Sequence, residues 1–458
     1  MNSFELIPTE ENLIHTLDKD LLKRNKDLVR FYDLILAQEG ASSIAIDGRW
    51  GSGKTFFVKQ SMLLINAKNP MSDMDDEKKA SIVYALPFPE KSEDVPENYN
   101  VAVYYDAWEN DNDTDPVLSL VYEIIKQLGI NYDFDDNGNI FKLAGSVLEA
   151  FTGRNINSII ENLKSDNPLT KIKEEKDLHE NIKNFFTELL VERGNRLVIF
   201  IDELDRCKPS YAVHLLERIK HYLCDERITF VFSVNLGELQ HTIKHYYGNT
   251  FDACRYLDRF FDMRLSLPPA DKTAFYREMG LDTGYGLEKV SRKVIDTYNM
   301  ELREATRFYR QVKTAAYEPT HDSRKWDFGF SDGKGKKLLL MYITPILVGL
   351  KIVDISLYND FVNGKNSKPL MDIYKESDLE DWLCSGLLNR DEAFEEIEGK
   401  TLVTVEQKLQ SLYEAIFVTE YTNGVYHTMI GDYEFDSNSK HFVRSIESML
   451  SVYADYEL

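Results

Sequence analysis

The sequence predicts an α/β fold in which a parallel sheet is covered by helices on both faces. Short apolar runs that indicate buried strands alternate along the chain with segments of helical periodicity. Strands connected in this way usually pair in parallel, and continuous apolar runs are typical of strands buried on both faces. The expected strands are Ser43–Ile46, Val101–Tyr105, Leu197–Ile201, Ile228–Val234 and Phe261–Leu267.

A helix is expected before the first strand. The segment from Asp18 to Leu36 carries apolar residues at near-helical spacing, which indicates an amphipathic helix. The strand Ser43–Ile46 is then broken by Gly48, and the segment from Phe56 to Ile65 has helical character. A strand, a glycine-containing loop and a helix therefore follow one another directly.

The loop between that strand and helix carries the strongest motif in the chain. Gly48 to Thr55 (GRWGSGKT) matches G-x-x-x-x-G-K-[ST], the P-loop motif, in the strand and helix context that its mechanism needs. Glycines let successive backbone N–H groups face phosphates, Lys54 neutralises the outer phosphates, and Thr55 is placed to bind magnesium. The expected nucleotide-binding residues are Gly48, Trp50, Gly51, Ser52, Gly53, Lys54, Thr55 and Phe56.

Two long stretches interrupt the expected core. Residues from about 66 to 100 are polar, acidic and proline-bearing, which predicts a surface insertion or a long connection. Pro116 suits the first turn of a helix whose apolar face runs to Leu128. Residues from about 130 to 177 have weak periodicity and indicate a second insertion, and a clear helical stripe follows from Leu178 to Leu190.

The strand Leu197–Ile201 ends in two carboxylates, Asp202 and Glu203, which is the form of a Walker B segment. Coupled to a P-loop, this pattern predicts that Asp202 holds magnesium through water and that Glu203 positions and polarises the attacking water. Asp205 is compatible with a second magnesium-side or water-orienting carboxylate, and equally with a structural role together with Arg206.

Further polar residues are candidates for contact with the outer phosphate. Asn235 follows the strand Ile228–Val234 and is a candidate sensor, with capping of the next helix as an alternative of equal weight. Arg255, Arg259 and Arg303 are candidates for stabilising transition-state charge, and the sequence does not choose between them. Arg303 shares a helical face with Arg307 and Arg310, which is typical of a solvated basic stripe; a sensor or anion-binding surface is the alternative. The residues expected to act in catalysis are Lys54, Glu203, Asn235, Arg259 and Arg303.

The expected organisation has four parts. Residues 1–40 form an N-terminal helical segment, 41–270 the P-loop core with its two insertions, 271–328 a helical lid, and 329–458 a separate, mostly helical C-terminal region. The most apolar segment, from Leu338 to Leu357, contains Pro345, Lys351 and Asp354. We therefore expect a buried helix pair, or a helix and a turn, there rather than a membrane span.

Composition argues against several classes of protein. The 54 Lys and Arg against 77 Asp and Glu give a net charge of −23, whose field repels nucleic-acid backbones and anionic membranes. The four cysteines form no CxxC pair, which argues against a disulfide framework and a zinc ribbon. His241 and His245 lack the adjacent Glu of a zinc protease. The acidic N-terminus does not resemble a signal peptide, so a cytoplasmic location is expected.

Three ordered motifs resemble those of the KAP family of P-loop NTPases. They are GRWGSGKT at Gly48–Thr55, YDAW at Tyr105–Trp108 and IDELDRC at Ile201–Cys207, and YLDR at Tyr256–Arg259 looks like a later family element. The resemblance covers about Ser43 to Arg310. It implies an ATPase of the additional-strand class that uses ATP and Mg²⁺, with a long insertion between the two Walker segments and a helical lid.

The resemblance also suggests a cellular setting. Many relatives carry membrane helices in the insertion, whereas this sequence has no spanning segment there. Bacterial relatives often occur in phage-defence or mobile-element systems, and antiviral defence is the setting that this analogy suggests.

The leading functional hypothesis is an ATP-driven regulatory switch. Nucleotide binding would change the relative position of core and lid, and this movement would control a partner or effector protein. A homo-oligomer is compatible with this scheme, and the sequence shows no nuclease, protease or deaminase signature. The alternatives are a P-loop phosphotransferase acting on a small molecule and a non-catalytic nucleotide-binding scaffold. The sequence leaves the preference between ATP and GTP open.

Overall fold

The chain folds into two compact units in the computed structural model, Leu6–Asp271 and Lys272–Leu458, the latter together with Met1–Glu5. The structure describes residues 7–88, 99–129, 180, 182–190, 193–222, 225–282, 286–321, 333–374, 383, 386–422, 424 and 426–454. The second expected insertion, at about 130–177, lies outside the described residues.

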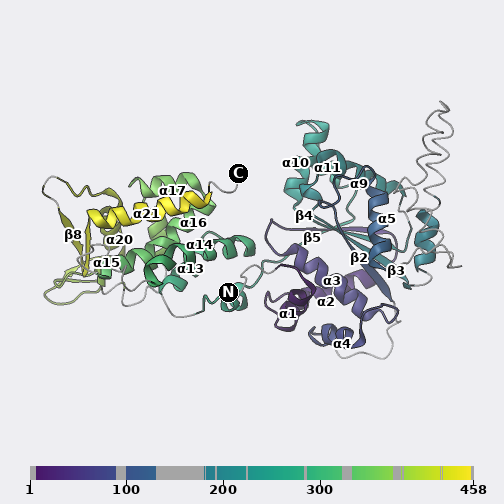
Figure 1. Ribbon diagram of the computed structural model, residues 1–458, viewed down its shortest axis with the longest axis horizontal. Coiled ribbons are helices and arrows are strands. Elements are labelled where there is room, and N and C mark those ends of the chain that lie inside the picture. The colour runs from purple at the N-terminus through teal and green to yellow at the C-terminus, as the bar shows by residue number, and fades with distance from the viewer. Residues whose placement is uncertain are drawn as a thin grey trace. The chain divides into compact units, whose positions relative to one another are not determined.

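The first unit is built on a five-stranded sheet (Figure 1). The sheet order is β2-β3-β4-β1-β5, and all four neighbouring pairs are parallel. β4 lies between β1 and β3, which is the inserted strand that defines the additional-strand class. The predicted fold class is therefore confirmed. The strands are β1 (Ser42–Asp47), β2 (Asn100–Asp106), β3 (Arg196–Asp202), β4 (Ile228–Val234) and β5 (Met263–Ser266).

Helices cover both faces of this sheet, as the apolar strands require (Figure 1). One face packs against α1 (Glu10–Asp18), α2 (Asn25–Leu36), α3 (Lys54–Lys68) and α4 (Asp76–Tyr84). The opposite face packs against α5 (Pro116–Gln127), the helical residues 182–190, α9 (Pro209–Tyr222), α10 (Leu236–Tyr247) and α11 (Ala253–Leu257). Phe200 and Val231 point to the first face, whereas Ile199 and Phe230 point to the second.

The amphipathic helix expected from Asp18 to Leu36 is present over Asn25–Leu36, but its predicted start at Asp18 is wrong. α1 begins after the N-cap Thr9 and ends at Asp18, and α2 begins only at Asn25. Asp20 and Lys23 between them have φ angles of 44° and 54°, a left-handed conformation that interrupts a helix. The buried Asn25 side chain donates to the carbonyls of Leu17 (2.7 Å) and Ala85 (3.0 Å) and so stabilises the turn. Tertiary contacts decide this break, which the apolar spacing does not show.

The connection expected at about 66–100 is more than a surface feature. It contains α4, whose N-cap Asp75 accepts hydrogen bonds from the backbone of Glu77 and Lys78. Ile82 on α4 is 1% exposed, and Ile82 and Leu86 pack into the same apolar cluster as α1 and α3. These residues therefore belong to the core packing that supports the helix after the P-loop.

The second unit is mostly helical and carries short strands. Its helices among the described residues include α12 (Lys272–Glu278), α13 (Gly286–Thr297), α14 (Leu302–His321), α15 (Gly333–Leu338), α16 (Thr344–Val353), α17 (Ile355–Val362), α18 (Lys368–Tyr374), α20 (Val405–Tyr413) and α21 (Ser437–Ala454). β8 (His427–Ile430) and β9 (Tyr433–Asp436) form an antiparallel pair, and β6 (Glu392–Ala393) pairs with β7 (Thr401–Leu402).

A lid at 271–328 and a separate region after it are expected, but the helices before and after residue 328 pack against each other. α16 packs against both α13 and α14. The contact is close enough that a Cβ at Gly349 of α16 would collide with Val294 of α13 and lie 3.4 Å from the Phe308 ring of α14. The helices on both sides of residue 328 thus share one apolar core.

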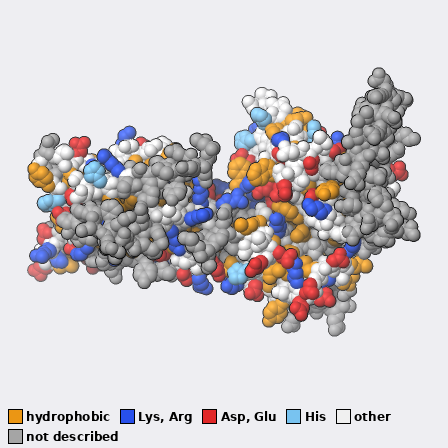
Figure 2. Space-filling model, in the orientation of Figure 1, with side chains coloured by type: hydrophobic (Ala, Val, Ile, Leu, Met, Phe, Trp, Pro, Cys, Tyr) orange, Lys and Arg blue, Asp and Glu red, His pale blue; other side chains and the backbone are white. Residues whose placement is uncertain are grey.

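The apolar segment from Leu338 to Leu357 forms a π-helical turn (Leu339–Ile343), α16 and the start of α17. Among the helices in the described ranges, none combines the length and apolar character needed to cross a bilayer. Acidic and basic side chains are interspersed over the face of the molecule shown in Figure 2.

Candidate nucleotide-binding site

The P-loop connects the carboxyl end of β1 to the first residue of α3. Its start is fixed to the neighbouring strand because the Gly48 N–H donates to the carbonyl of Val234 at the end of β4 (3.2 Å). Gly51 and Gly53 have φ angles of 81° and 89°, which glycine adopts without the steric cost of a side chain. These conformations let the loop turn directly into the N-terminus of α3, and anions bind favourably at a helix N-terminus.

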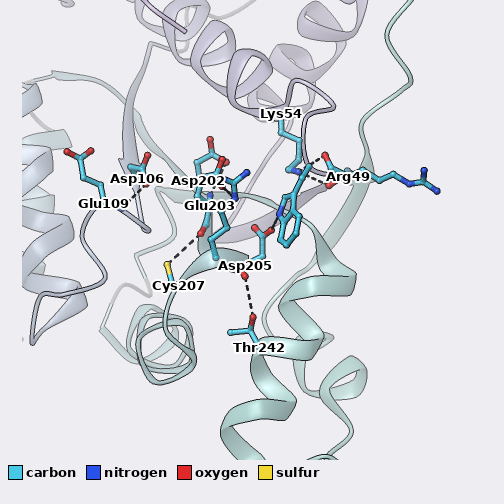
Figure 3. A network of polar contacts seen from close by, with 12 residues as sticks. Arg49, Lys54, Asp106, Glu109, Asp202, Glu203, Asp205, Cys207 and Thr242 are labelled. Carbon is cyan, nitrogen blue, oxygen red and sulfur yellow. Dashed lines mark hydrogen bonds and ion pairs between the residues drawn. The ribbon is translucent and has the colours of Figure 1, made fainter. Parts of the chain in front are cut away.

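Lys54 lies at the base of this loop and is 8% exposed. Its Nζ donates to the carbonyls of Gly48 (2.6 Å) and Arg49 (3.1 Å) (Figure 3). Burial lowers the pKa of Lys54, and the neighbouring carboxylates, Asp205 first, oppose this shift. Figure 3 shows the Arg49 side chain directed away from Lys54. Of the two basic residues of the loop, Lys54 therefore points toward the loop's own backbone and Arg49 points away from it.

Two observations fit a bound phosphate group and its metal. A Cβ at Gly48 would lie 2.9 Å from Ser52 Oγ and 3.4 Å from two Lys54 side-chain carbons, so the loop closes tightly around this point. Within the described part of the chain, the buried hydroxyl oxygens of Ser52 and Ser233 have no hydrogen-bond partner. Buried polar atoms are rarely left unsatisfied, and a ligand or its hydration shell is a usual explanation.

Arg24, in the turn between α1 and α2, also stabilises the P-loop by a hydrogen bond. The Arg24 guanidinium donates to the carbonyl of Ser52 (2.9 Å) and to the carbonyl of Pro268 (2.5 Å), and the residue is 5% exposed. The backbone N–H of Asp271 also donates to the Leu22 carbonyl (3.3 Å). Arg24 therefore joins the phosphate loop to the segment that leads out of the first unit.

Asp202 ends β3 and is 1% exposed. Its carboxylate accepts hydrogen bonds from the backbone N–H of Glu203 (3.0 Å) and from the hydroxyl of Tyr104 on β2 (3.1 Å). Ser233 of β4 lies opposite Asp202 in the parallel register and is fully buried. Both lie on the sheet face that α3 covers, so a carboxylate and a free hydroxyl lie beside the P-loop.

Glu203 follows Asp202 with a left-handed backbone conformation (φ 61°, ψ 22°). For a residue other than glycine this costs about 1–2 kcal/mol, and such strain is typical of functional sites. Burial raises the pKa of Glu203 to about 7, Asp202 adds to this shift, and Arg206 opposes it. The Arg206 Nε forms an ion pair with Glu203 Oε2. Glu203 is therefore a carboxylate whose position and protonation are set by its neighbours.

Asp205 connects three elements of the site. The Trp50 indole N–H of the P-loop donates to Asp205 Oδ2 (2.6 Å), and the Asp205 carbonyl accepts from Thr242 of α10 (3.2 Å) (Figure 3). Burial raises the pKa of Asp205, which the hydrogen bond from Trp50 opposes. A structural pairing of Asp205 with Arg206, which the sequence leaves open, is not seen, because Arg206 forms its ion pair with Glu203.

The remaining predicted site residues are placed differently. Asn235 is the N-cap of α10, where its Oδ1 accepts from Gly237 (3.2 Å) and Glu238 (3.4 Å); its sensing role stays a prediction. Arg255 and Arg259 are exposed, and neither side chain is hydrogen-bonded to the P-loop or to β3 among the described residues. Arg303 is exposed on α14 of the second unit. The structure thus brings together Lys54, Asp202, Glu203 and the loop Gly48–Thr55, but not these arginines.

The donor set suits Mg²⁺ better than a transition metal. Thr55 supplies a hydroxyl and Asp202 a carboxylate, and magnesium prefers such oxygen ligands together with waters and phosphate oxygens. His241 and His245 are both exposed on α10. No cluster of three His, Cys, Asp or Glu side chains that could hold a metal ion occurs in the ranges that the structure covers. These residues therefore fit a magnesium ion that is bound mainly through the nucleotide.

Sequence reasoning assigned no role in this site to four residues, although Asp106 belongs to the YDAW motif and Ser233 ends the strand before Asn235. Tyr104 donates a hydrogen bond to Asp202, and Ser233 lies opposite Asp202 in the sheet. Their positions at or near the carboxyl ends of β2 and β4 are the signal that could have identified them. Asp106, whose pKa is raised by burial, ends β2 beside Asp202. Arg24 carries no such signal, because it reaches the P-loop only through the turn between α1 and α2.

The sheet order, the P-loop at the end of β1 and the acidic end of β3 define a P-loop NTPase of the additional-strand class. The KAP family P-loop domain matches residues 25–318, which is more than half of the chain. The chain belongs to this family, as the sequence motifs indicate.

A short stretch also matches a curated protein. It is 45% identical over 53 residues to an uncharacterized protein of the archaeon Methanocaldococcus jannaschii, and the match covers 10% of this chain and 27% of that protein. The chain therefore spans about a quarter of the length of this relative.

Proposed function

We propose that this protein binds ATP with Mg²⁺ and hydrolyses it, and that turnover serves as a regulatory switch. The observation that carries the proposal is the meeting of Lys54, Asp202 and Glu203 at one edge of the sheet, next to the buried hydroxyls of Ser52 and Ser233, which have no hydrogen-bond partner among the described residues. Membership of the KAP family supports nucleotide binding at this edge.

The chemical roles follow from the positions of the side chains. The backbone N–H groups of the P-loop and Lys54 would hold the outer phosphates, and Lys54 would exchange the Gly48 and Arg49 carbonyls for phosphate oxygens. Mg²⁺, held with the help of Thr55 and Asp202, would offset the phosphate charge. Glu203 would orient a water molecule and accept its proton as the water oxygen attacks the γ-phosphorus. The bond to the bridging oxygen then breaks, which yields ADP and phosphate.

The switch is supported by the contacts between the P-loop and the segment that precedes Lys272 in the chain. Arg24 donates to the carbonyls of both Ser52 and Pro268, and the second unit begins at Lys272. A change in the loop on nucleotide binding would therefore reach the connecting segment directly. We propose that this coupling controls a partner or effector protein, because no catalytic motif other than the P-loop and Walker B segments is evident in the sequence.

Two substitutions test the hydrolytic function. Lys54→Ala should abolish nucleotide binding and phosphate release, whereas Glu203→Gln should retain binding and lose about 10²- to 10⁴-fold in turnover. Lys126→Ala and Glu123→Gln are matched controls, because these residues form an ion pair on α5 in which Lys126 is exposed and Glu123 partly buried, and both variants should leave both quantities unchanged.

The outcomes separate the competing functions. Transfer of labelled phosphate to a small-molecule acceptor instead of water would indicate a phosphotransferase. Nucleotide that stays bound to wild-type protein without turnover would indicate a scaffold. For the switch, small-angle scattering should differ between the ATP-bound Glu203→Gln protein and the ADP-bound protein, and identical profiles would refute it.

A further inference from the structure

The ion pair between Arg206 and Glu203 is a short-range contact inside the turn that follows β3. The two residues are three positions apart in the 3₁₀ segment Leu204–Arg206 and its N-cap. Their side chains are 22% and 16% exposed. Removing one member of a mostly buried pair leaves the other charge without compensation, so the positions of the two groups depend on each other.

The Arg206 guanidinium also contacts two aromatic rings, which belong to two other loops. Its central carbon lies over the Trp50 ring, 5.7 Å from the centroid, and over the Trp108 ring, 5.5 Å from the centroid. Trp50 belongs to the P-loop, and Trp108 follows β2. A planar guanidinium stacks on aromatic faces in a way that a lysine ammonium does not. Both indoles are substantially exposed, at 44% and 53%, although large apolar side chains are usually buried.

The surroundings of Glu203 explain why its carboxylate needs such a partner. Asp202, Asp205 and Asp106 all repel it electrostatically, and Arg206 is the attractive charge that acts on it most strongly. Loss of this cation would leave the Glu203 carboxylate facing three like charges without an ion-pair partner. The contacts of Arg206 are with Glu203 and the two indoles, whereas Lys54 and Asp202 are held by other groups.

We propose that Arg206, held by the Trp50 and Trp108 rings, is the positioning residue for Glu203 and fixes the carboxylate that orients the attacking water. This inference rests on the hydrolytic function proposed above. Because one of the two rings belongs to the P-loop, the arrangement ties the position of Glu203 to the loop that binds the phosphates. Loss of Arg206 should therefore lower kcat and leave nucleotide affinity nearly unchanged.

The test compares full-length Arg206→Ala and Arg206→Lys with Arg218→Ala. Arg218 is a matched control, because it forms an ion pair with Asp115 at similar exposure and lies on α9 outside the site. We expect Arg206→Ala to lose about tenfold to a hundredfold in kcat, with a dissociation constant for ATP within about twofold of wild type. Arg206→Lys should recover only part of this loss. Guanidinium ion at millimolar concentration should restore turnover to Arg206→Ala but not to Glu203→Gln, which a merely structural role would not produce.

Other results would overturn the inference. Turnover of Arg206→Ala equal to that of Arg218→Ala would mean that Arg206 does not position Glu203, and faster turnover than wild type would mean that the pair restrains it. If Arg206→Ala does not fold, Trp108→Ala is the second test of the proposal. We expect it to lower kcat by less than the tenfold to hundredfold expected for Arg206→Ala, with unchanged affinity for ATP, and an unchanged kcat would refute the proposal. Wild-type turnover no higher than that of Lys54→Ala would remove both the hydrolytic function and this inference. An active wild type with an unaffected Arg206→Ala would remove the inference alone.

Discussion

The Trp50 indole of the P-loop donates a hydrogen bond to the carboxylate of Asp205 in the turn after β3, at 2.6 Å. This bond joins the two segments whose meeting creates the site, and these segments are 155 positions apart in the chain. Asp205 is 6% exposed, and the Trp50 hydrogen bond is the largest of the interactions that stabilise its charged carboxylate, ahead of backbone hydrogen bonds from Asp205 and Asn235 and the charge of Lys54. The tryptophan within the motif therefore has a role beyond wrapping around phosphates: it fixes the P-loop against the acidic edge.

Trp50→Phe should weaken the contact between the two segments. It removes the N–H donor and keeps an aromatic ring beside Arg206, so we expect a loss of about 1–3 kcal/mol in the free energy of unfolding of the first unit and weaker nucleotide binding. Trp108→Phe is the control, because no hydrogen bond from its indole is found within the described ranges. Urea unfolding and nucleotide titration measure both effects. Equal behaviour of the two variants would contradict the role assigned to the Trp50 N–H.

Tyr104→Phe should raise the Mg²⁺ concentration needed for nucleotide binding. The Tyr104 hydroxyl donates to Asp202 Oδ2, and loss of a hydrogen bond that orients a metal ligand typically costs tenfold or more in metal affinity, so we expect about a tenfold shift. The readout is binding of a fluorescent ATP analogue as Mg²⁺ is titrated. Tyr105→Phe is the matched control: its hydroxyl contacts Ser119 (3.0 Å) and Tyr211 (2.5 Å) on the opposite face of the sheet. A shift in the control as large as in Tyr104→Phe would argue against this role.

Gly48→Ala should reduce nucleotide affinity by about tenfold, or about 1.4 kcal/mol. The added Cβ would lie 2.9 Å from Ser52 Oγ and 3.4 Å from Lys54 carbons, so the residues that face the phosphates must move. Gly40→Ala is a suitable control, because its Cβ would have no atom within 4 Å and the position lies just before β1. Calorimetric titration with ATP and Mg²⁺ distinguishes them, and unchanged affinity in Gly48→Ala would show that the loop is less tightly closed than described.

Cys207 and Cys254 should differ strongly in reactivity. Cys207 is 4% exposed and its Sγ–H donates to the Glu203 carbonyl (3.6 Å), and burial with nearby carboxylates raises the pKa of its thiol. Because the thiolate is the reactive form, alkylation at neutral pH should modify the exposed Cys254 first and reach Cys207 only on unfolding. Peptide mass spectrometry over a time course follows both sites. Equal rates in the native protein would mean that the turn after β3 opens readily.

The sequence by itself determined the strand pattern, the P-loop and the acidic end of β3, because each of them is a pattern of residues that are adjacent in the chain. Apolar runs define buried strands, and the spacing of glycines, Lys54 and Thr55 defines a phosphate loop whatever surrounds it. The parallel sheet followed from the alternation of strands and helices. For the same reason the family resemblance was visible before the fold.

Only the tertiary structure decided which distant side chains complete the site. The Trp50 bond to Asp205, the Arg24 bonds to Ser52 and Pro268, and the placement of Ser233 opposite Asp202 all join segments that are far apart in sequence. Such contacts depend on strand order and on turns like the one at Asp20 and Lys23, whose left-handed residues leave no periodic signal. Local patterns encode elements, whereas packing between elements selects the partners of each buried charge.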